Sequence, residues 1–253
     1  MKKASMARLE IKGFVEASFC DWDGRISAVV FLAGCNLRCP FCQNGDLVLA
    51  PERLESTGFD TLSDYLCRNR EWIDGVVLTG GEPTISDGLQ ELAGRLKALG
   101  FGVKLDTNGT RPDVVRQMID RGLVDYVAMD VKAPLDERYG AAAGAAVDLG
   151  AIRSSIATVM SMPGEAYEFR TTLVPGLVGE GEVEEVARAV RGAARLVLQQ
   201  FVPDKCLDTG LRGAVPYTDA AVEGMVGRAH AHVKRCFFRG KPGSVLPRKG
   251  EIL

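Results

Sequence analysis

The stretch that decides the fold reads Gly34-Cys35-Asn36-Leu37-Arg38-Cys39-Pro40-Phe41-Cys42. The residues before it, 27–33, form a short apolar run that is typical of a buried strand. The cysteines have the spacing C-x3-C-x2-C and follow this strand on a loop. Thiols placed this close together are typical of a metal or iron–sulfur centre in a reducing compartment, rather than of a disulfide framework.

The three thiols of Cys35, Cys39 and Cys42 suit a cubane cluster, because three ligands leave one of its irons open to a small molecule. Such an iron is comparable to the open position of a catalytic zinc site. A closed zinc site is an alternative, but the two histidines, His230 and His232, lie near the far end of the chain. Three buried cysteines without a role are a further alternative. The spacing favours the cluster over both.

The composition is that of an ordinary globule, with 46% hydrophobic and 25% charged residues among 253. The net charge of −2 gives no reason to expect a nucleic-acid or membrane partner. No apolar run approaches the roughly 18 residues of a membrane span, and no signal-peptide core follows Met1-Lys2-Lys3. The sequence therefore predicts a cytoplasmic protein. Four more cysteines are scattered and expected to be ordinary thiols: Cys20, Cys67, Cys206 and Cys236.

Outward from the first strand, apolar runs alternate with helical patterns. Further strands are predicted at residues 75–79, 102–106, 124–131, 167–174 and 195–201. Helices are predicted at 86–99 with Ser86 as N-cap, 112–121, 183–190 and 220–232, before a last apolar stretch at 233–238. This alternation predicts a parallel sheet with helices outside, as a partial barrel or an open sheet. In both, chemistry gathers at the carboxyl ends of the strands.

Glycines and polar residues stand where the predicted strands end. Gly80-Gly81-Glu82-Pro83 follows the second strand; paired glycines let a backbone approach a ligand, although many β-α turns have them. Lys104 and Asp106 share a face of the third strand, and Asp130 and Lys132 share a face of the fourth. Such charges are structural pairs or parts of a polar pocket. The next two strands carry weaker candidates for such a pocket, namely Arg170, Thr172, Gln199 and Gln200.

The cysteine motif, with an aromatic residue directly before its third cysteine, resembles that of the radical S-adenosylmethionine (SAM) superfamily. The resemblance covers residues 20–203. It implies a single domain over 1–253, an α/β fold of the partial (β/α)6 barrel type, and a C-terminal helix and strand extension at 204–253. It also implies a [4Fe–4S] cluster on Cys35, Cys39 and Cys42, with SAM bound to the open iron. An electron from the cluster splits SAM and leaves a 5′-deoxyadenosyl radical.

The other motifs imply further contacts to SAM. By resemblance, Phe41 lies against the adenine, and the motif of Gly80, Gly81 and Glu82 binds the methionyl ammonium. The remaining implied SAM contacts are Asp106, Asn108, Asp130, Lys132, Arg170 and Gln200. A monovalent cation is implied at Asp106, Thr107 and Asp130.

Within the superfamily, the chain resembles the activating enzymes of glycyl-radical enzymes. Its overall pattern is similar to that of anaerobic ribonucleoside-triphosphate reductase activating proteins. The likeness is carried by residues 29–36, 104–109, 124–132, 170–176 and 198–201. It implies a glycyl-radical enzyme as partner, with an anaerobic ribonucleotide reductase as the expected one. It also implies a flavodoxin- or ferredoxin-like electron donor.

Two departures from the activating enzymes concern the substrate. Asp23-Gly24-Arg25 keeps part of their Asp-Gly-Pro-Gly, and Cys42-Gln43-Asn44 replaces their Cys-His-Asn. Gln200 stands near the place of a histidine. Residues 20–25 are expected to form a mobile loop at the cofactor mouth. The alternative function is that of a radical enzyme acting on a small molecule or RNA, such as a deazapurine synthase. A non-catalytic iron–sulfur or zinc protein is the third hypothesis.

Overall fold

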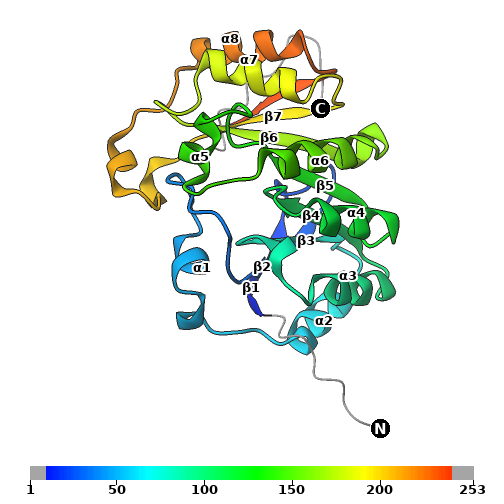
Figure 1. Ribbon diagram of the computed structural model, residues 1–253. Helices are drawn as coiled ribbons and strands as arrows, with labels where there is room; N and C mark the ends of the chain where they lie inside the picture. The colour runs from blue at the N-terminus through cyan, green and yellow to red at the C-terminus, as the bar shows by residue number, and fades with distance from the viewer. Residues whose placement is uncertain (1–9, 241–253) are drawn as a thin grey trace. The chain divides into compact units, whose positions relative to one another are not determined.

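The computed structural model describes residues 10–240, apart from the side chain of Lys205 (Figure 1). Residues Met1 to Lys3 and the last part of the predicted C-terminal extension, 241–253, lie outside the described residues. The chain divides into two compact units. The first unit holds residues 10–38, 43–129 and 148–167, and the second holds 39–42, 130–147 and 168–240. The cysteine motif is therefore shared, with Cys35 in the first unit and the other two cysteines in the second.

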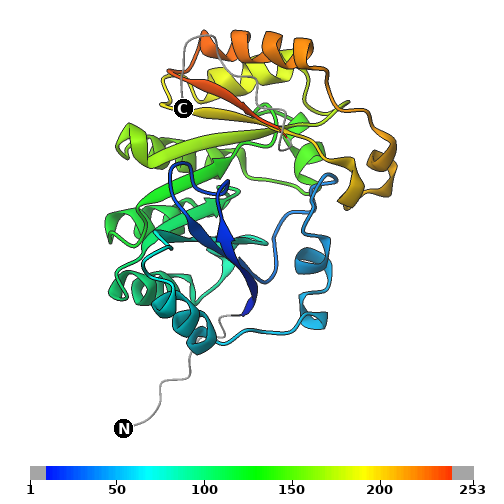
Figure 2. The same ribbon diagram turned by 180° about the vertical axis from the view of Figure 1, so that it is seen from behind.

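Within each unit the strands follow one another in chain order, from β1 to β5 in the first and from β6 to β8 in the second. Those of the first unit are β1 (Ile11–Ser18), β2 (Ser27–Leu32), β3 (Gly75–Gly80), β4 (Gly102–Thr107) and β5 (Tyr126–Asp130). Strand β1 pairs with β2 in the antiparallel sense, and the remaining pairs are parallel. Figure 2 shows β1 and β2 side by side as the two blue strands. The predicted strands of this unit are confirmed, while β1 was not predicted.

Helices of the first unit lie between these strands in the chain or, in the case of α6, after the last of them. They are α1 (Gly45–Leu49), α2 (Phe59–Arg68), α3 (Leu89–Ala98), α4 (Pro112–Asp120) and α6 (Leu149–Met160), with short 3-10 turns at Pro51–Arg53, Pro83–Ile85 and Gly164–Ala166. Figure 1 shows α3 and α4 on one side of β3, β4 and β5. The predicted N-cap of α3 is wrong, because the 3-10 turn after Glu82 displaces the helix start and Gly88 takes the N-cap place of Ser86.

The second unit repeats the pattern on a smaller scale. Its strands β6 (Tyr167–Leu173), β7 (Leu196–Gln200) and β8 (Cys236–Arg239) pair in parallel. Its helices are α5 (Arg138–Ala143), α7 (Glu180–Ala189) and α8 (Asp219–His230), with 3-10 turns at Pro203–Lys205 and Thr209–Gly213. Helix α8 and strand β8 are the predicted C-terminal helix and strand.

The register of the first unit brings the strand ends to one edge. Leu32, the last residue of β2, lies opposite Gly80, the last residue of β3. On β4, Leu105 lies opposite Leu78 of β3, so that Thr107 ends the strand at the same edge. The cysteine loop, the glycine pair and the segment after Thr107 therefore start side by side, as parallel strands require.

Residues 20–25 lie at the opposite ends of the strands. The ring of Trp22 is only 5% exposed and packs with Val29, Val77, Tyr126 and Ala128. A Cβ atom on Gly75, the first residue of β3, would lie 2.7 Å from a carbon of this ring. The prediction that this segment borders the cofactor mouth is therefore wrong. Burial of the indole fixes the segment at the amino ends, a tertiary contact that outweighs the loop propensity of Gly24.

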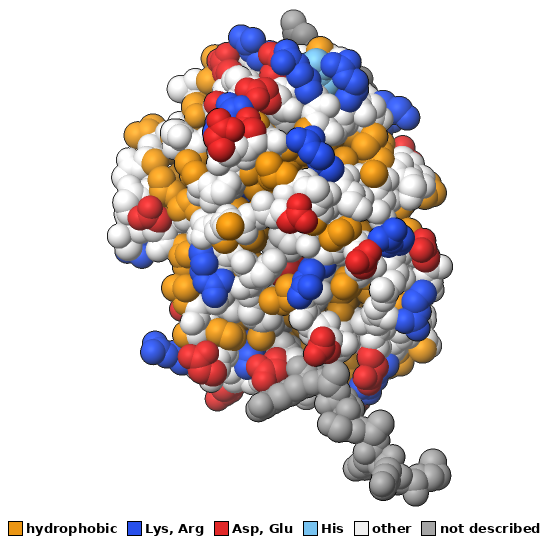
Figure 3. Space-filling view, in the orientation of Figure 1, with side chains coloured by type: hydrophobic (Ala, Val, Ile, Leu, Met, Phe, Trp, Pro, Cys, Tyr) orange, Lys and Arg blue, Asp and Glu red, His pale blue; other side chains and the backbone are white. Residues whose placement is uncertain are grey.

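Charged side chains of both signs are interspersed with hydrophobic ones on the face seen in Figure 3. This distribution agrees with the net charge of −2. In residues 10–240, none of the helices is both long enough and apolar enough to cross a membrane.

We expect Trp22→Ala to lower the free energy of unfolding by about 3–5 kcal/mol, because the missing ring leaves a cavity in a packed cluster. Trp72 is the matched control, since its side chain is 70% exposed, and Trp72→Ala should cost less than about 0.5 kcal/mol. Urea titration followed by circular dichroism measures both variants. Equal losses would show that Trp22 is no core residue.

Candidate functional site

The glycine pair after β3 lets the cysteine loop lie against the strand end. A Cβ atom on Gly80 would come within 2.5 Å of the amide nitrogen of Leu32, and one on Gly81 within 1.7 Å of the carbonyl oxygen of Gly34. The backbone N–H of Glu82 donates to that same Gly34 oxygen over 2.7 Å. Past the cysteines, the Asn44 amide donates to the carbonyl of Gly80 over 2.7 Å. Both ends of the cysteine loop are thus fastened to the end of β3.

The carboxylate of Glu82 is 2% exposed and joins the ends of β3 and β4. It accepts hydrogen bonds from the Thr84 amide (3.1 Å) and hydroxyl (2.5 Å), the Thr107 hydroxyl (2.7 Å) and the Asn108 amide (2.6 Å). Four donors are about as many as a carboxylate accepts. Burial raises the pKa of Glu82, whereas these donors favour its charged form. A contact of this side chain with SAM stays a prediction.

Asn108 connects the segment after β4 with the cysteine loop. Its side-chain amide nitrogen lies 3.0 Å from Oδ1 of Asn36 and 4.0 Å from Sγ of Cys35. Its oxygen accepts from the amide (3.0 Å) and hydroxyl (2.7 Å) of Thr110, which fixes the orientation of the amide group. The backbone N–H of Leu37 also donates to Sγ of Cys35 over 3.4 Å. Two N–H groups therefore face this sulfur.

Lys104 and Asp106 form a buried pair on β4, as the alternation of side chains predicted. Nζ of Lys104 lies 3.4 Å from Oδ1 of Asp106 and donates to the carbonyl of Asp21. It also lies 5.6 Å from the centre of the Tyr126 ring. The structural alternative accounts for Lys104, while Asp106 and Thr107 as cation ligands stay a prediction.

In the second unit, Asp130 lies between two cations. Its carboxylate contacts Nζ of Lys132 at 2.8 Å and Nε of Arg170 at 2.7 Å. The backbone brings them together, because the N–H of Val131 donates to the carbonyl of Arg170 over 2.8 Å. Burial alone would raise the pKa of Asp130, but Arg170 and Lys132 hold it well below its ordinary value. Burial likewise opposes the charge of Lys132, and Asp130 raises the pKa of Lys132 above its ordinary value.

Lys132 links this ion pair to the second half of the cysteine motif. Its ammonium lies 5.9 Å from the centre of the Phe41 ring. Burial raises the pKa of Cys39, and the charge of Lys132 offsets part of that rise. The hydroxyl of Tyr139, a residue of α5, accepts from the backbone N–H of Lys132 over 3.4 Å, and burial raises the pKa of Tyr139 to about 12. Sequence reasoning missed Tyr139, because a single tyrosine in a helix gives no sign of its burial.

The remaining candidate, Gln200, ends β7 opposite Leu173 of β6 and is half-buried. The structure thus places the predicted SAM contacts in two groups. Those of the first unit are Gly80, Gly81, Glu82, Asp106 and Asn108, and those of the second are Phe41, Asp130, Lys132, Arg170 and Gln200. The first group lies at the ends of its strands or on the loops that follow them, whereas in the second group Arg170 lies in the middle of β6 and Phe41 in the cysteine loop.

The thiols of the motif have the chemistry that an anionic cluster requires. Cys39 is buried and Cys42 half-buried, and a turn joins them through a hydrogen bond from the Cys42 amide to the Cys39 carbonyl (3.0 Å). N–H donors face the sulfur of Cys35, and a cation is near Cys39. Such outer contacts stabilise thiolate-bound centres. In residues 10–240, no three Cys, His, Asp or Glu side chains form a group that could hold a single metal ion.

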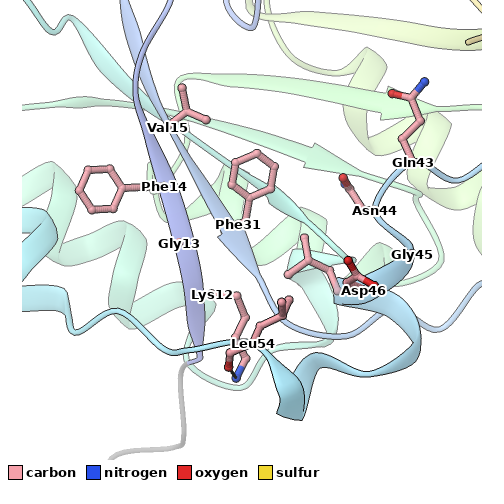
Figure 4. Close-up of a pocket in the computed structure, with 11 residues that line it drawn as sticks. Lys12, Gly13, Phe14, Val15, Phe31, Gln43, Asn44, Gly45, Asp46 and Leu54 are labelled. Atoms are coloured by element: carbon pink, nitrogen blue, oxygen red, sulfur yellow. Dashed lines mark hydrogen bonds between the residues drawn. The ribbon is translucent and has the colours of Figure 1, made fainter. Parts of the chain in front are cut away.

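A pocket of about 320 Å³ in the first unit begins directly after the third cysteine (Figure 4). Its apolar lining includes Phe31 and Val15, and Gly13 opposite Phe31 adds no side chain. The ring of Phe14 points the other way and packs on Tyr65. The polar lining consists of Lys12, Gln43, Asn44 and Asp46. Sequence reasoning missed this pocket because β1 was not predicted.

Comparison with known proteins decides the family. Residues 29–190 match the model of the radical SAM superfamily. The chain belongs to the radical SAM superfamily. Its cofactors are a [4Fe–4S] cluster and SAM, and its fold is the predicted partial barrel. The solved coproporphyrinogen III oxidase of Escherichia coli, which is described as a radical SAM enzyme, has a similar fold. Its TM-score is 0.57 at 13% identity, over 80% of this chain and 50% of that one.

Two curated relatives point to different reactions. A protein of Methanocaldococcus jannaschii named "Putative glycyl-radical enzyme activating enzyme" is 36% identical over 78% of this chain and 82% of its own length. A 7-carboxy-7-deazaguanine synthase of Thermococcus kodakarensis is 29% identical over 71% of this chain and 76% of its own length. The match over more than half of the chain establishes the superfamily. The two relatives, however, are named for different reactions.

We expect Asp130→Asn to lower the free energy of unfolding by about 2 kcal/mol near neutral pH, because Lys132 and Arg170 lose their shared partner. The folded-state pKa of Asp130 is lowered, so its contribution is present above the unfolded pKa of about 3.9 and disappears as the pH falls through the folded pKa. The difference between variant and wild type should therefore shrink in acid. Urea titrations over a pH series measure it.

The control for this prediction is Asp113→Asn, which removes an exposed partner of Arg116. It should change stability by less than about 0.5 kcal/mol at every pH. A loss at Asp130 that is equally small, or that grows in acid, would contradict the assigned ion pair.

Proposed function

We propose that this protein is an activating enzyme, which generates a glycyl radical on a partner enzyme. The observation that carries the proposal is the likeness to the M. jannaschii protein named for this activity, since it extends over 82% of that protein. We further propose an anaerobic ribonucleotide reductase as partner and a flavodoxin- or ferredoxin-like electron donor. Thiol ligation of a redox centre favours the cytoplasm as its location.

In this proposal, the thiolates of Cys35, Cys39 and Cys42 hold the cluster. When bound, the cluster and SAM together supply the 5′-deoxyadenosyl radical. Lys132 holds a positive charge beside Phe41 and favours an anionic centre at this loop. The remaining predicted contacts bind and orient SAM from the ends of the strands.

A glycine is a sterically suitable substrate for such a radical. Hydrogen transfer needs the reacting carbons roughly 3–3.5 Å apart, and a residue without a side chain permits that approach. The bound cofactors would supply the radical that takes one hydrogen atom from the glycine Cα, and the unpaired electron would then remain on the glycine. The protein's share of the work is to orient the reactants and exclude water.

The second candidate is a radical enzyme that acts on a small molecule, similar to the T. kodakarensis synthase. The observation that favours it is the pocket beside Gln43 and Asn44. Its volume of about 320 Å³ falls at the lower end of the range for small-molecule sites. Gln43 lies in the motif that departs from the activating enzymes.

Anaerobic reconstitution should give about four irons and four sulfides in each chain, as one cubane requires. Cys35→Ala, Cys39→Ala and Cys42→Ala should each abolish the cluster, because each removes one of its three thiolates. Cys67→Ala is the matched control, since this exposed cysteine lies outside the motif. Iron analysis and absorption spectra measure the outcome. A full cluster in the Cys39→Ala variant would refute the assignment.

The reduced protein, mixed with SAM and a cognate anaerobic ribonucleotide reductase, should produce a glycyl doublet in electron paramagnetic resonance. A reductase with its radical glycine changed to alanine is the control and should give no doublet. If no glycyl-radical enzyme of the organism gives a doublet while a small molecule is turned over, the second candidate replaces the first.

A further inference from the structure

Asn108, one of the predicted SAM contacts, also lies beside a thiol of the cysteine motif. It is buried, and its amide nitrogen faces Sγ of Cys35 at 4.0 Å. The amide cannot turn freely, because Thr110 donates twice to its oxygen and Asn36 accepts from its nitrogen. The nitrogen, and not the oxygen, is therefore presented to the sulfur.

The backbone of Asn108 is held as firmly as its side chain. Its N–H donates to Oε2 of Glu82 over 2.6 Å, and the neighbouring Thr107 donates to Oε1 of the same carboxylate over 2.7 Å. Asn36 also donates to the hydroxyl of Thr110 over 2.8 Å, so that two segments are joined in both directions. These contacts all lie within the first unit.

We propose that Asn108, fixed by Glu82, is a positioning residue that sets the reduction potential of the cluster through its amide and the sulfur of Cys35. The inference rests on the proposed function in one respect, namely that Cys35 is a cluster ligand. It assigns to Asn108 a role toward the thiolate, in addition to its predicted contact with SAM.

The direction of the effect follows from charge. Reduction adds an electron to an anionic cluster, and an N–H donor at a ligand sulfur stabilises the more negative state. Removal of the donor therefore makes reduction harder and moves the midpoint to a more negative potential. A carboxylate in place of the amide should move the midpoint potential in the same direction and by a larger amount, because it adds a negative charge close to the sulfur.

The test is a potentiometric titration of the reconstituted protein, without SAM and without partner, followed by electron paramagnetic resonance. In Asn108→Ala, the ratio of reduced to oxidised cluster at a fixed potential should fall about three- to tenfold, where tenfold corresponds to about 59 mV for one electron. Asn108→Asp has nearly the shape of the wild-type side chain, so it provides a second variant if the alanine variant folds poorly. In Asn108→Asp, the ratio of reduced to oxidised cluster should fall at least as far as in Asn108→Ala.

The matched control is Thr84→Val, which removes one donor from Glu82 but leaves the Asn108 contact with Cys35 in place. It should keep the wild-type potential even where it lowers stability. Wild-type potentials in both Asn108 variants, at full iron content, would overturn this inference and leave the proposed function standing. Failure of the wild-type chain to assemble a cluster would instead overturn the proposed function.

Discussion

The buried carboxylate of Glu82 is the constraint on which the first unit's half of the site depends. An unpaired charge at 2% exposure would be strongly unfavourable, so the surrounding donors have to be in place whenever the chain is folded. Those donors come from the turn after β3 and from the end of β4, two segments about 25 residues apart in the chain. A single side chain thereby fixes the relative position of two loops, one of which reaches the sulfur of Cys35.

The second unit also holds a carboxylate, that of Asp130, in a fixed position, but by a different kind of interaction. There, a half-buried carboxylate is held by two cations, Lys132 and Arg170, instead of by neutral donors. Breaking such a pair leaves uncompensated charge, so the arrangement is rigid as long as all three members are present. Lys132 serves two neighbours at once, because it also lies over Phe41 in the cysteine loop. The ion pair with Asp130 and the contact with the Phe41 ring therefore both restrain the side chain of Lys132.

Much of the fold could be predicted because its parallel strands are continuous apolar runs, as at residues 75–79. Strand β1 could not, since Gly13 interrupts it and its exposed residues, 15–17, are consecutive instead of alternating with buried ones. Trp22 was misplaced because its burial depends on the space left by Gly75, far away in the chain. In the site, the residue types at strand ends were predictable from side-chain alternation, whereas the saturation of Glu82 by four donors depends on contacts that no sequence pattern records.

The contact between Gly81 and Gly34 has a consequence for evolution and for engineering. A Cβ atom on Gly81 would lie 1.7 Å from the carbonyl oxygen of Gly34. The two backbones are therefore in direct contact and leave no space for a side chain. The cysteine loop therefore cannot change its length or its backbone course unless the turn after β3 changes as well. Grafting a loop of another specificity onto this scaffold would therefore require the exchange of both segments as one module.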